Sequence, residues 1–370
     1  MNFFRLVRLF LVSIALLAGA NCSGASHSNG AGGAPDDDLS PADDDSSPDD
    51  DDDDDFVWSQ MPGSFAALFA VWGSASSDVY AVGGATNNGN EQSAIVHFDG
   101  SRWIPIKSGE GPFYLTAISG TSAANVIAVG KGGQSAILRF DGAAWVNVSV
   151  ADGLGFLQGV WAASEAEFFV VSYEKTDGIA GRFDGANWTI FEDNLPPLLF
   201  AVWGASPSDV FIGGYGISHF DGNVWTSAPG IDDTEMYCSF WGSSATDVFA
   251  VGNPGSPDAG PFTAPAYPSV IVHYDGQSWS EMRRNATDVL SGIWGTSPTD
   301  VFAVGGSEAA ENIWQDTILH YDGSSWSVMD RGSFPVYLRN AWGSSPGDVF
   351  AVGYDANFAA GVILHYGPPE

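Results

Sequence analysis

The sequence is poor in positive charge. It contains 12 Lys and Arg against 45 Asp and Glu in 370 residues. From Phe56 onward, 32 acids and 10 bases leave a net charge of −22. A domain that acidic repels phosphate backbones, which argues against nucleic acid as a partner.

Cysteine is also scarce, and two cysteines cannot build a disulfide framework. Cys238 lies alone in the long C-terminal part, where a small buried residue is the expectation. Cys22 lies in a tail near the N-terminus. If Cys22 carries a lipid, no disulfide is possible.

Apolar runs long enough to cross a bilayer are missing. The apolar stretch Leu9–Leu17 is too short for a good transmembrane helix. Because Arg5 and Arg8 precede it, residues 1–21 read as an export signal. Cleavage after Ala20 fits the small-x-small rule, whereas cleavage before Cys22 would give a bacterial lipoprotein. The residues before Cys22 depart from the usual Leu-Ala-Gly pattern, but we expect lipidation.

Residues 22–55 are rich in Ser, Gly, Pro and Asp, with seven consecutive Asp at the end. They carry too little apolar surface to offset the entropy lost on ordering, so we expect a disordered linker. A soluble spacer is favoured over loose calcium binding, because the turn-making Gly and fixed ligand spacing of a calcium loop are missing.

What the sequence does contain, from residue 56 to 370, is a repeat. Asp-Gly pairs precede a Trp in six copies, beginning at Asp99, Asp141, Asp184, Asp221, Asp275 and Asp322, and a truncated copy ends the chain. Periods near 40 residues with strong β character indicate a β-propeller with one blade per repeat. Each repeat predicts four strands, here termed a to d, with the Asp-Gly hairpin between c and d.

The tryptophan count predicts how the ring closes. Six Trp follow an Asp-Gly turn and mark strand d, whereas seven a–b–c sets are present. Trp58 supplies the seventh, ahead of the first strand a. We therefore expect an all-β, seven-bladed propeller of four antiparallel strands per blade, in which the N-terminal segment completes the last blade.

The segment VFAVGG…ILHYDGSSWSVM, ending at Met329, resembles a kelch motif. The preceding half, WGSSPxDVFAVG, resembles repeats of exported bacterial propellers. The resemblance implies a binding or scaffolding role and supplies no catalytic residues.

Recurring residues favour structural roles. Five His share one repeat position, but two other repeats place Arg139 and Arg182 there, so neither a metal nor a cofactor is expected. The acid before strand b is expected to accept hydrogen bonds from amides of the a–b turn. The Trp ending strand a is expected in packing between blades, with sugar binding as the alternative.

Catalytic motifs are not found: GxSxG, HExxH and phosphate loops do not occur, and no spacing singles out a carboxylate pair. We therefore expect a non-enzymatic monomer. An extracellular carbohydrate-active hydrolase or lyase using carboxylates at the channel mouth is the alternative, and a purely structural surface protein is the second.

The b–c and d–a connections vary in length, whereas the a–b and c–d turns do not. Variable loops on a rigid scaffold commonly carry binding sites. We predict that the face with the variable loops binds a protein or glycan at the cell envelope. The candidate ligand-binding residues are those that break the repeat, and we expect all of them in these loops. Trp314 lies in the sixth b–c loop, Phe262 and Tyr267 in the fifth b–c loop, Arg283 and Arg284 in the fifth d–a loop, and Tyr354 and Asp355 at the start of the seventh b–c loop.

Overall fold

The protein is described from a computed structural model. The chain divides into Met1–Asp55 and Phe56–Glu370, and all described residues belong to the second unit. They are residues 56–87, 90–106, 114–132, 134–173, 178–254, 268–310, 313–329, 334–355 and 360–368. The signal, Cys22 and the linker, as well as Phe262 and Tyr267, lie outside these ranges.

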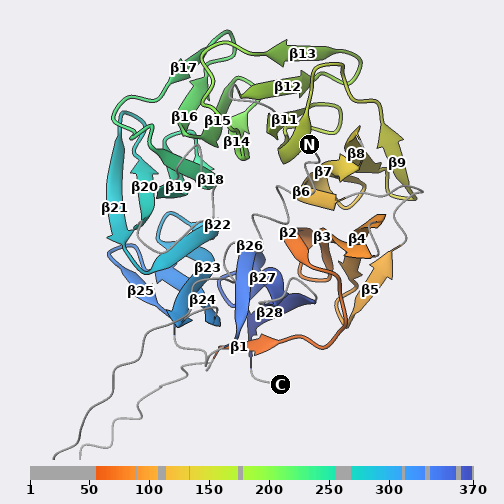
Figure 1. The fold of residues 1–370 in the computed structure, drawn as a ribbon, viewed down its shortest axis with the longest axis vertical. Coiled ribbons are helices and arrows are strands. Elements are labelled where there is room, and N and C mark those ends of the chain that lie inside the picture. The colour runs from red at the N-terminus through yellow and green to blue at the C-terminus, as the bar shows by residue number, and fades with distance from the viewer. Residues whose placement is uncertain are drawn as a thin grey trace, which may run out of the picture. The chain divides into compact units, whose positions relative to one another are not determined.

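Phe56–Glu370 is a seven-bladed β-propeller, as predicted. Seven four-stranded antiparallel sheets surround one axis, with strand a innermost (Figure 1). The a strands are β2 (Leu68–Ala75), β6 (Tyr114–Ser122), β10 (Phe156–Ala162), β14 (Ala201–Ser206), β18 (Glu235–Ser244), β22 (Asp288–Ser297) and β26 (Val336–Ser345). The b strands are β3 (Asp78–Asn87), β7 (Asn125–Gly132), β11 (Phe168–Tyr173), β15 (Asp209–Gly214), β19 (Asp247–Pro254), β23 (Asp300–Ala310) and β27 (Asp348–Asp355).

The two outer strands of each blade follow in the same order. The c strands are β4 (Asn90–Phe98), β8 (Gln134–Phe140), β12 (Ile179–Phe183), β16 (Gly216–Phe220), β20 (Ser269–Tyr274), β24 (Ile313–Tyr321) and β28 (Gly361–Gly367). The d strands are β5 (Trp103–Ile106), β9 (Trp145–Val148), β13 (Trp188–Phe191), β17 (Trp225–Ser227), β21 (Trp279–Asn285), β25 (Trp326–Val328) and β1 (Val57–Gln60). The described residues contain only strands and turns, so no helix able to span a bilayer occurs among them.

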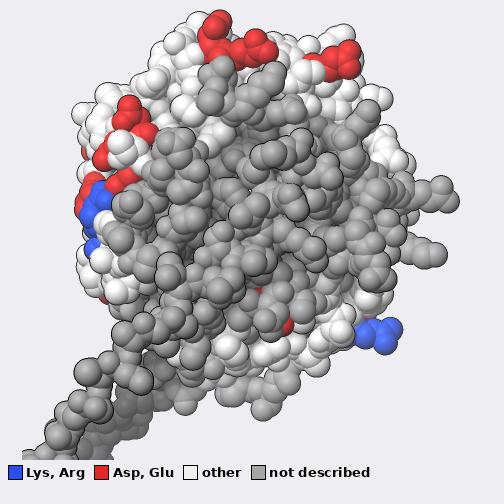
Figure 2. Space-filling model, viewed as in Figure 1, with Lys and Arg blue, Asp and Glu red and all other residues white. Residues whose placement is uncertain are grey.

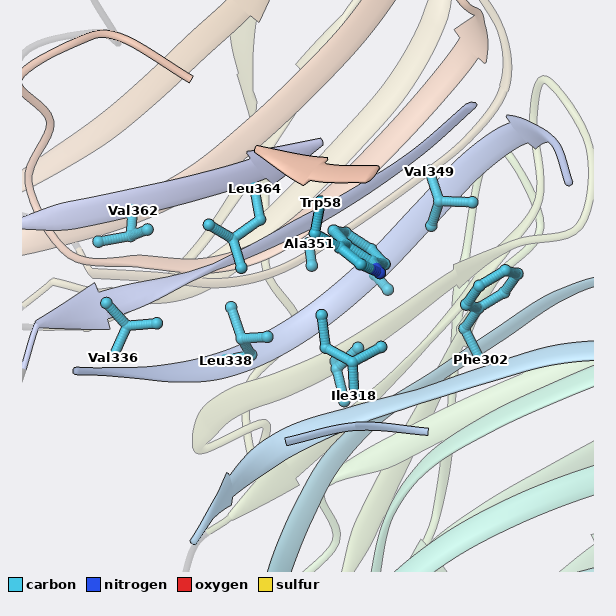
Figure 3. Close-up of a cluster of buried hydrophobic side chains, with 11 residues drawn as sticks. Trp58, Phe302, Ile318, Val336, Leu338, Val349, Ala351, Val362 and Leu364 are labelled. Carbon is cyan, nitrogen blue, oxygen red and sulfur yellow. The ribbon is translucent and has the colours of Figure 1, made fainter. Parts of the chain in front are cut away.

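The ring closes through β1, as the tryptophan count predicts. β1 pairs with β28, so that the last blade has the order β1-β28-β27-β26. Trp58 is 5% exposed and packs between the sixth and seventh blades with Phe302, Ile318 and Leu364 (Figure 3). Its indole Nε1 donates to the sulfur of Met329 at 3.4 Å.

The core consists of seven apolar clusters, one at each contact between neighbouring blades. Both faces of each sheet are covered, which is why strands a to c are near-continuous runs of Val, Ile, Leu, Ala and Phe rather than alternating ones. An eighth, small cluster of Ala67, Tyr337 and Tyr354 lies apart from these seven.

Tryptophan at the end of strand a seals six of the seven contacts, as expected. The indole of Trp241 covers Gly295 of the next blade so closely that a Cβ there would lie 2.9 Å from it. Equivalent pairs occur around the ring and across its closure, where Trp342 covers Gly73. The second repeat has Ser119 instead, whose hydroxyl accepts a hydrogen bond from the Ala162 amide at 3.0 Å. The replacement of Trp therefore coincides with replacement of the Gly it would cover.

The Asp-Gly hairpins form as predicted. Gly100 adopts φ 90°, a region that other residues rarely enter. The Asp99 carboxylate accepts from the amides of Ser101 and Arg102 at 2.9 and 3.0 Å. Because the four strands of each blade are antiparallel, the a–b and c–d turns lie on one face of the ring, which we call the turn face. The b–c and d–a connections lie on the opposite face, which we call the loop face.

Three segments expected as loops are strands. In the sixth blade, Glu308 pairs with Trp314 and Ser307 with Gln315, so β23 and β24 extend into the insert. Tyr354 and Asp355 end β27 instead of opening a loop, and Arg283 and Arg284 pair with β20. Lengthened hairpins satisfy more backbone hydrogen bonds than an irregular loop would, and a single sequence does not show where the pairing stops.

Candidate ligand-binding site

The recurring acids and histidines form structural pairs within each blade. In five blades the His ring nitrogen lies 2.6 to 2.8 Å from Oδ1 of the Asp that begins strand b. In the first blade the second oxygen of Asp78 accepts from the Ser74 hydroxyl at 2.5 Å. The expected partners were turn amides, whereas the contacts shown are to side chains. His97 also stacks on Tyr80, with ring centroids 4.4 Å apart.

The two blades without this histidine use equivalent polar pairs. Arg139 donates to Asn125 at 2.9 Å, and Arg182 lies 2.5 Å from Glu167. Each pair joins strand c to the start of strand b at the turn face. No group of three His, Cys, Asp or Glu that could hold a metal occurs among the described residues. The pairs therefore hold strands b and c of each blade together. We look for a binding site among the positions that differ between blades.

Arg283 and Arg284 are held in ion pairs on the fifth blade. Arg283 lies 2.8 Å from the buried Asp288 at the start of the next blade. Arg284 lies 2.5 Å from the buried Glu235 and 2.7 Å from Glu281. Figure 2 shows basic side chains among acidic ones at the edge where Figure 1 places β21. These contacts link strand d to strand a of its own blade and of the next one.

Burial dominates the electrostatics of this cluster. It raises the pKa of Glu235, although the Arg284 guanidinium opposes the shift. One carboxylate oxygen of Glu235 and one of Asp288 are buried with no hydrogen-bond partner. Both arginines thus form ion pairs with neighbouring carboxylates. They contribute to the structure of the blade whether or not they also bind a ligand.

Tyr354 belongs to a cluster of aromatic side chains near the axis at the loop face. Tyr337 and Tyr354 are cross-strand partners in the seventh blade and stack with centroids 5.7 Å apart. Phe69 of the first blade meets Tyr354 edge-on at 6.0 Å, and Tyr114 of the second blade lies 6.3 Å from Phe69. We call these four residues the aromatic arc; it spans three consecutive blades.

Basic side chains flank the aromatic arc. Lys131, the cross-strand partner of Tyr114, lies over the Phe156 ring at 4.1 Å from its centroid. Arg339 lies at the bulge of β26, two residues after Tyr337. Asp355 accepts a hydrogen bond from the Ala360 amide at 3.2 Å. The arc therefore combines apolar rings with cationic groups in a domain that is otherwise strongly acidic.

Each arc residue occupies a position at which the seven blades differ. Phe69 lies at a bulge of strand a, between a buried Leu and a small residue, and six of the inner strands have this bulge. The equivalent residues are Phe69, Thr116, Gln158, Phe200, Cys238, Ser291 and Arg339. Tyr114 and Tyr337 directly precede the Leu. Aligning the repeats by position reveals this variation, but the predictions considered variable loops and so missed Phe69, Tyr114, Tyr337 and Arg339.

Cys238 lies at one of these bulges and is chemically quiet. It is half-buried, and its thiol donates to the carbonyls of Leu290 at 3.4 Å and Val251 at 3.6 Å. Burial raises the pKa of Cys238 to about 11. The thiol is therefore protonated at neutral pH, which is unsuitable for a nucleophile.

The remaining candidates are not placed by the structure. Phe262 and Tyr267 lie outside the described residues, as does Cys22. The backbone of Trp314 lies in β24, but its side chain is not described. Of the seven predicted residues, the structure places Tyr354 in the aromatic arc, with Asp355 next to it at the end of β27, and Arg283 and Arg284 in a separate ion-paired cluster.

Comparison with known proteins supports the fold. Neither a family model nor a curated protein sequence matches the chain. Solved propellers match at low identity. YCF48 bound to a D1 peptide is 15% identical, covering 85% of this chain and 97% of the other, with a TM-score of 0.58. The WD40 propeller domain of Doa1 is 12% identical, covering 82% and 95%, with a TM-score of 0.60.

An enzyme domain has the same architecture. The GH74 xyloglucanase from Xanthomonas campestris is 11% identical, covering 80% of this chain and 52% of the other, with a TM-score of 0.57. At these identities the likeness shows the fold alone, because propellers host many functions. The chain is thus a seven-bladed β-propeller similar in fold to YCF48, to the WD40 domain of Doa1 and to a xyloglucanase.

Proposed function

We propose that this protein is a non-enzymatic binding propeller that takes a segment of a partner protein at the aromatic arc. The observation that carries the proposal is the gathering of Phe69, Tyr114, Tyr337 and Tyr354 from three blades at variable positions. Aromatic rings clustered at the centre of an interface commonly supply its anchors. The repeated parts of the blades are occupied with holding the ring together.

The geometry favours a protein segment over a glycan. Sugars stack on open aromatic faces, but the faces of Tyr337 and Tyr354 are turned onto each other and each residue is 6% exposed. Phe69 and Tyr114 are half-buried. Such a wall suits an apolar side chain of a peptide. The structure of YCF48 with a D1 peptide supports peptide binding as a function that this architecture allows.

We further propose that the protein is exported, with Cys22 as its lipid anchor and the acidic linker as a spacer from the membrane. The N-terminal sequence and the likeness of the repeat to kelch motifs and to exported bacterial propellers support this placement. Mass spectrometry of the mature protein tests it. A diacylated or triacylated Cys22 is expected, and an unmodified N-terminus at Asn21 would rule out the anchor.

Peptide and glycan arrays probed with the purified protein test the proposed function. We expect retention on peptides with apolar side chains, and a loss of about tenfold in affinity for Tyr114→Ala, as for an interface anchor. The control is Val328→Ala, at an exposed residue of an outer strand. Trp314→Ala and Tyr267→Ala on the same arrays test the loop candidates. Retention on glycans alone, or an unchanged affinity of Tyr114→Ala, contradicts the proposal.

A carbohydrate-active enzyme is the competing function, which the fold shared with the GH74 xyloglucanase supports. Incubation with xyloglucan and other polysaccharides distinguishes the two. Turnover that disappears on substitution of one carboxylate would establish the enzyme and overturn the binding propeller.

A further inference from the structure

The outer strands of neighbouring blades meet through one repeated position. The third residue after the Trp that begins strand d lies in the same apolar cluster as the strand-d Trp of the next blade, at all seven contacts. Starting from the strand that closes the ring, the residues at this position are Met61, Ile106, Val148, Phe191, Ala228, Met282 and Met329. Four of them are plain hydrocarbons, so the contact needs an apolar group but not a sulfur.

Sulfur atoms flank the closing strand on both sides. Trp103 of the first blade donates from its indole Nε1 to the sulfur of Met61 at 3.1 Å, and Trp58 donates to the sulfur of Met329 at 3.4 Å. Trp103 and Trp58 are 8% and 5% exposed. The Met61 amide also donates to the Ile363 carbonyl at 2.9 Å. Met61, directly after β1, therefore joins the closing strand to the first blade through its sulfur.

Hydrogen bonds to sulfur are not a general requirement of the blade contact. Among the described residues, Trp145, Trp225 and Trp326 have a buried indole Nε1 without a hydrogen-bond partner. Met282 lies in the cluster of Trp326, so this contact contains a sulfur that accepts no hydrogen bond from the indole. Met282 is therefore a matched comparison for Met61, because it has the same repeat position and the same side chain.

We propose that Met61 is a site of oxidation by peroxides and that its sulfoxide weakens the docking of the closing strand. A lone pair of the thioether sulfur attacks one oxygen of hydrogen peroxide, so that an S–O bond forms and the O–O bond breaks. The sulfur loses two electrons to the peroxide, and the proton on the transferred oxygen passes to the departing hydroxide to give water. Methionine sulfoxide reductases reverse the change. The inference goes beyond the proposed binding function and does not depend on it.

The native contact has no place for the added oxygen. An oxygen on the side of the sulfur that faces Trp103 would force apart two atoms that lie 3.1 Å from each other. An oxygen on the other side leaves a partial positive charge on the sulfur, which then opposes the indole N–H. The sulfoxide also brings a polar group into the apolar cluster of Phe98 and Phe350, where burial without a partner is unfavourable. Oxidation should therefore loosen the contact from either side.

Burial differs among the described methionines in a way that the test can use. Met61 and Met282 are half-buried, whereas Met236 is 1% exposed. Oxidation of Met by peroxide favours exposed side chains. Met236 is therefore a protected reference within the same molecule, and Met282 reports oxidation at an equivalent position away from the closing strand.

Stepwise addition of hydrogen peroxide to the folded full chain tests the inference. Mass spectrometry of peptides measures oxidation at each Met, and hydrogen–deuterium exchange follows the amides of residues 57–61. We expect Met61 to be oxidised before Met236, and exchange at 57–61 to become about tenfold faster as the Met61 sulfoxide accumulates. Treatment with methionine sulfoxide reductases should restore the slow exchange.

Substitutions assign the effect to one sulfur. Met61→Leu conserves volume and removes the oxidisable atom, so peroxide should no longer accelerate exchange at 57–61, whereas Met282→Leu should respond as the native protein does. If Met61→Leu does not fold, the native protein decides through the dependence of exchange on the fraction of Met61 sulfoxide. The inference is overturned by unchanged exchange in fully oxidised Met61, by a Met61 that stays reduced after Met282 is oxidised, or by a full peroxide effect in Met61→Leu.

Discussion

The contact between the second and third blades offers a direct test of how the ring is sealed. Ser119 and Ala162 stand where the other six contacts have Trp and Gly. If the indole is accommodated only because the facing residue lacks a Cβ, the two positions must change together. Ser119→Trp, Ala162→Gly and the double variant therefore form a complete thermodynamic cycle.

The magnitudes follow from the equivalent contacts. A Cβ added at Gly120 or Gly295 would lie 2.6 or 2.9 Å from the facing indole, so Ser119→Trp alone should destabilise by about 1–3 kcal/mol through overpacking. Ala162→Gly alone should cost about 0.5–1 kcal/mol in backbone entropy. In the double variant the clash disappears and the half-buried indole contributes about 1–2 kcal/mol. Loss of the Ser119 hydrogen bond removes about 0.5–1.5 kcal/mol.

The double variant should therefore lie near the native stability, with a coupling of about 2 kcal/mol relative to the sum of the single changes. Urea unfolding followed by far-UV circular dichroism measures all four proteins. A double variant whose destabilisation equals the sum of the two single effects within about 0.5 kcal/mol would refute the Trp–Gly explanation. It would mean that the tryptophans seal the ring by some other contact.

Three further predictions concern the closure, the acids and the ion pairs. Trp58→Ala should destabilise the protein by about 3–5 kcal/mol, as for other buried Trp, which a lower urea midpoint would measure. A loss of stability smaller than that for an exposed apolar residue would contradict ring closure through β1. Hydrogen bonds from a seryl hydroxyl and turn amides lower the pKa of Asp99 and of Asp322 to about 2. The stability that these carboxylates contribute is full above the unfolded pKa near 4 and is lost as pH falls towards 2. Tm should therefore drop over that interval, and a constant Tm would contradict the prediction. Arg284→Ala leaves the buried Glu235 without its cation and should lower the free energy of unfolding by about 3–5 kcal/mol at pH 7. The loss should be smaller at pH 4, where Glu235 becomes protonated. Equal losses of stability at both pH values would argue against the ion pair.

The fold could be predicted because each blade corresponds to one recognisable repeat in the sequence. The Asp-Gly turns count the blades, and Trp58 shows that the missing outer strand comes from the N-terminal side. The Trp–Gly contact could be predicted in part, because packing against the next blade is an environment that every copy shares. What pairs with the Asp before strand b could not, since that partner lies on a strand about 20 residues away whose register only the folded sheet fixes.

The candidate site was less accessible to prediction. Phe69, Tyr114 and Tyr354 come from three blades, and ring closure brings the seventh blade beside the first. Loop length pointed to the loop face, which agrees with the location of Tyr354. It did not point to the bulge of strand a, where one residue per blade is free to vary. The end of β23 and the start of β24 were expected as a loop, because cross-strand pairing of polar residues leaves little pattern in the sequence.

The closing strand also has a consequence for the order in which the molecule can form. Trp58 and Met329, which touch in the finished ring, are 271 residues apart. The first strand made can therefore reach its place only after the last blade exists. Until β1 docks, β28 has an unpaired edge. Contacts of such sequence separation are slow to form. We expect the final docking of β1 to be a late step of folding, so its slowing would lengthen the time for which a β edge is open to other chains.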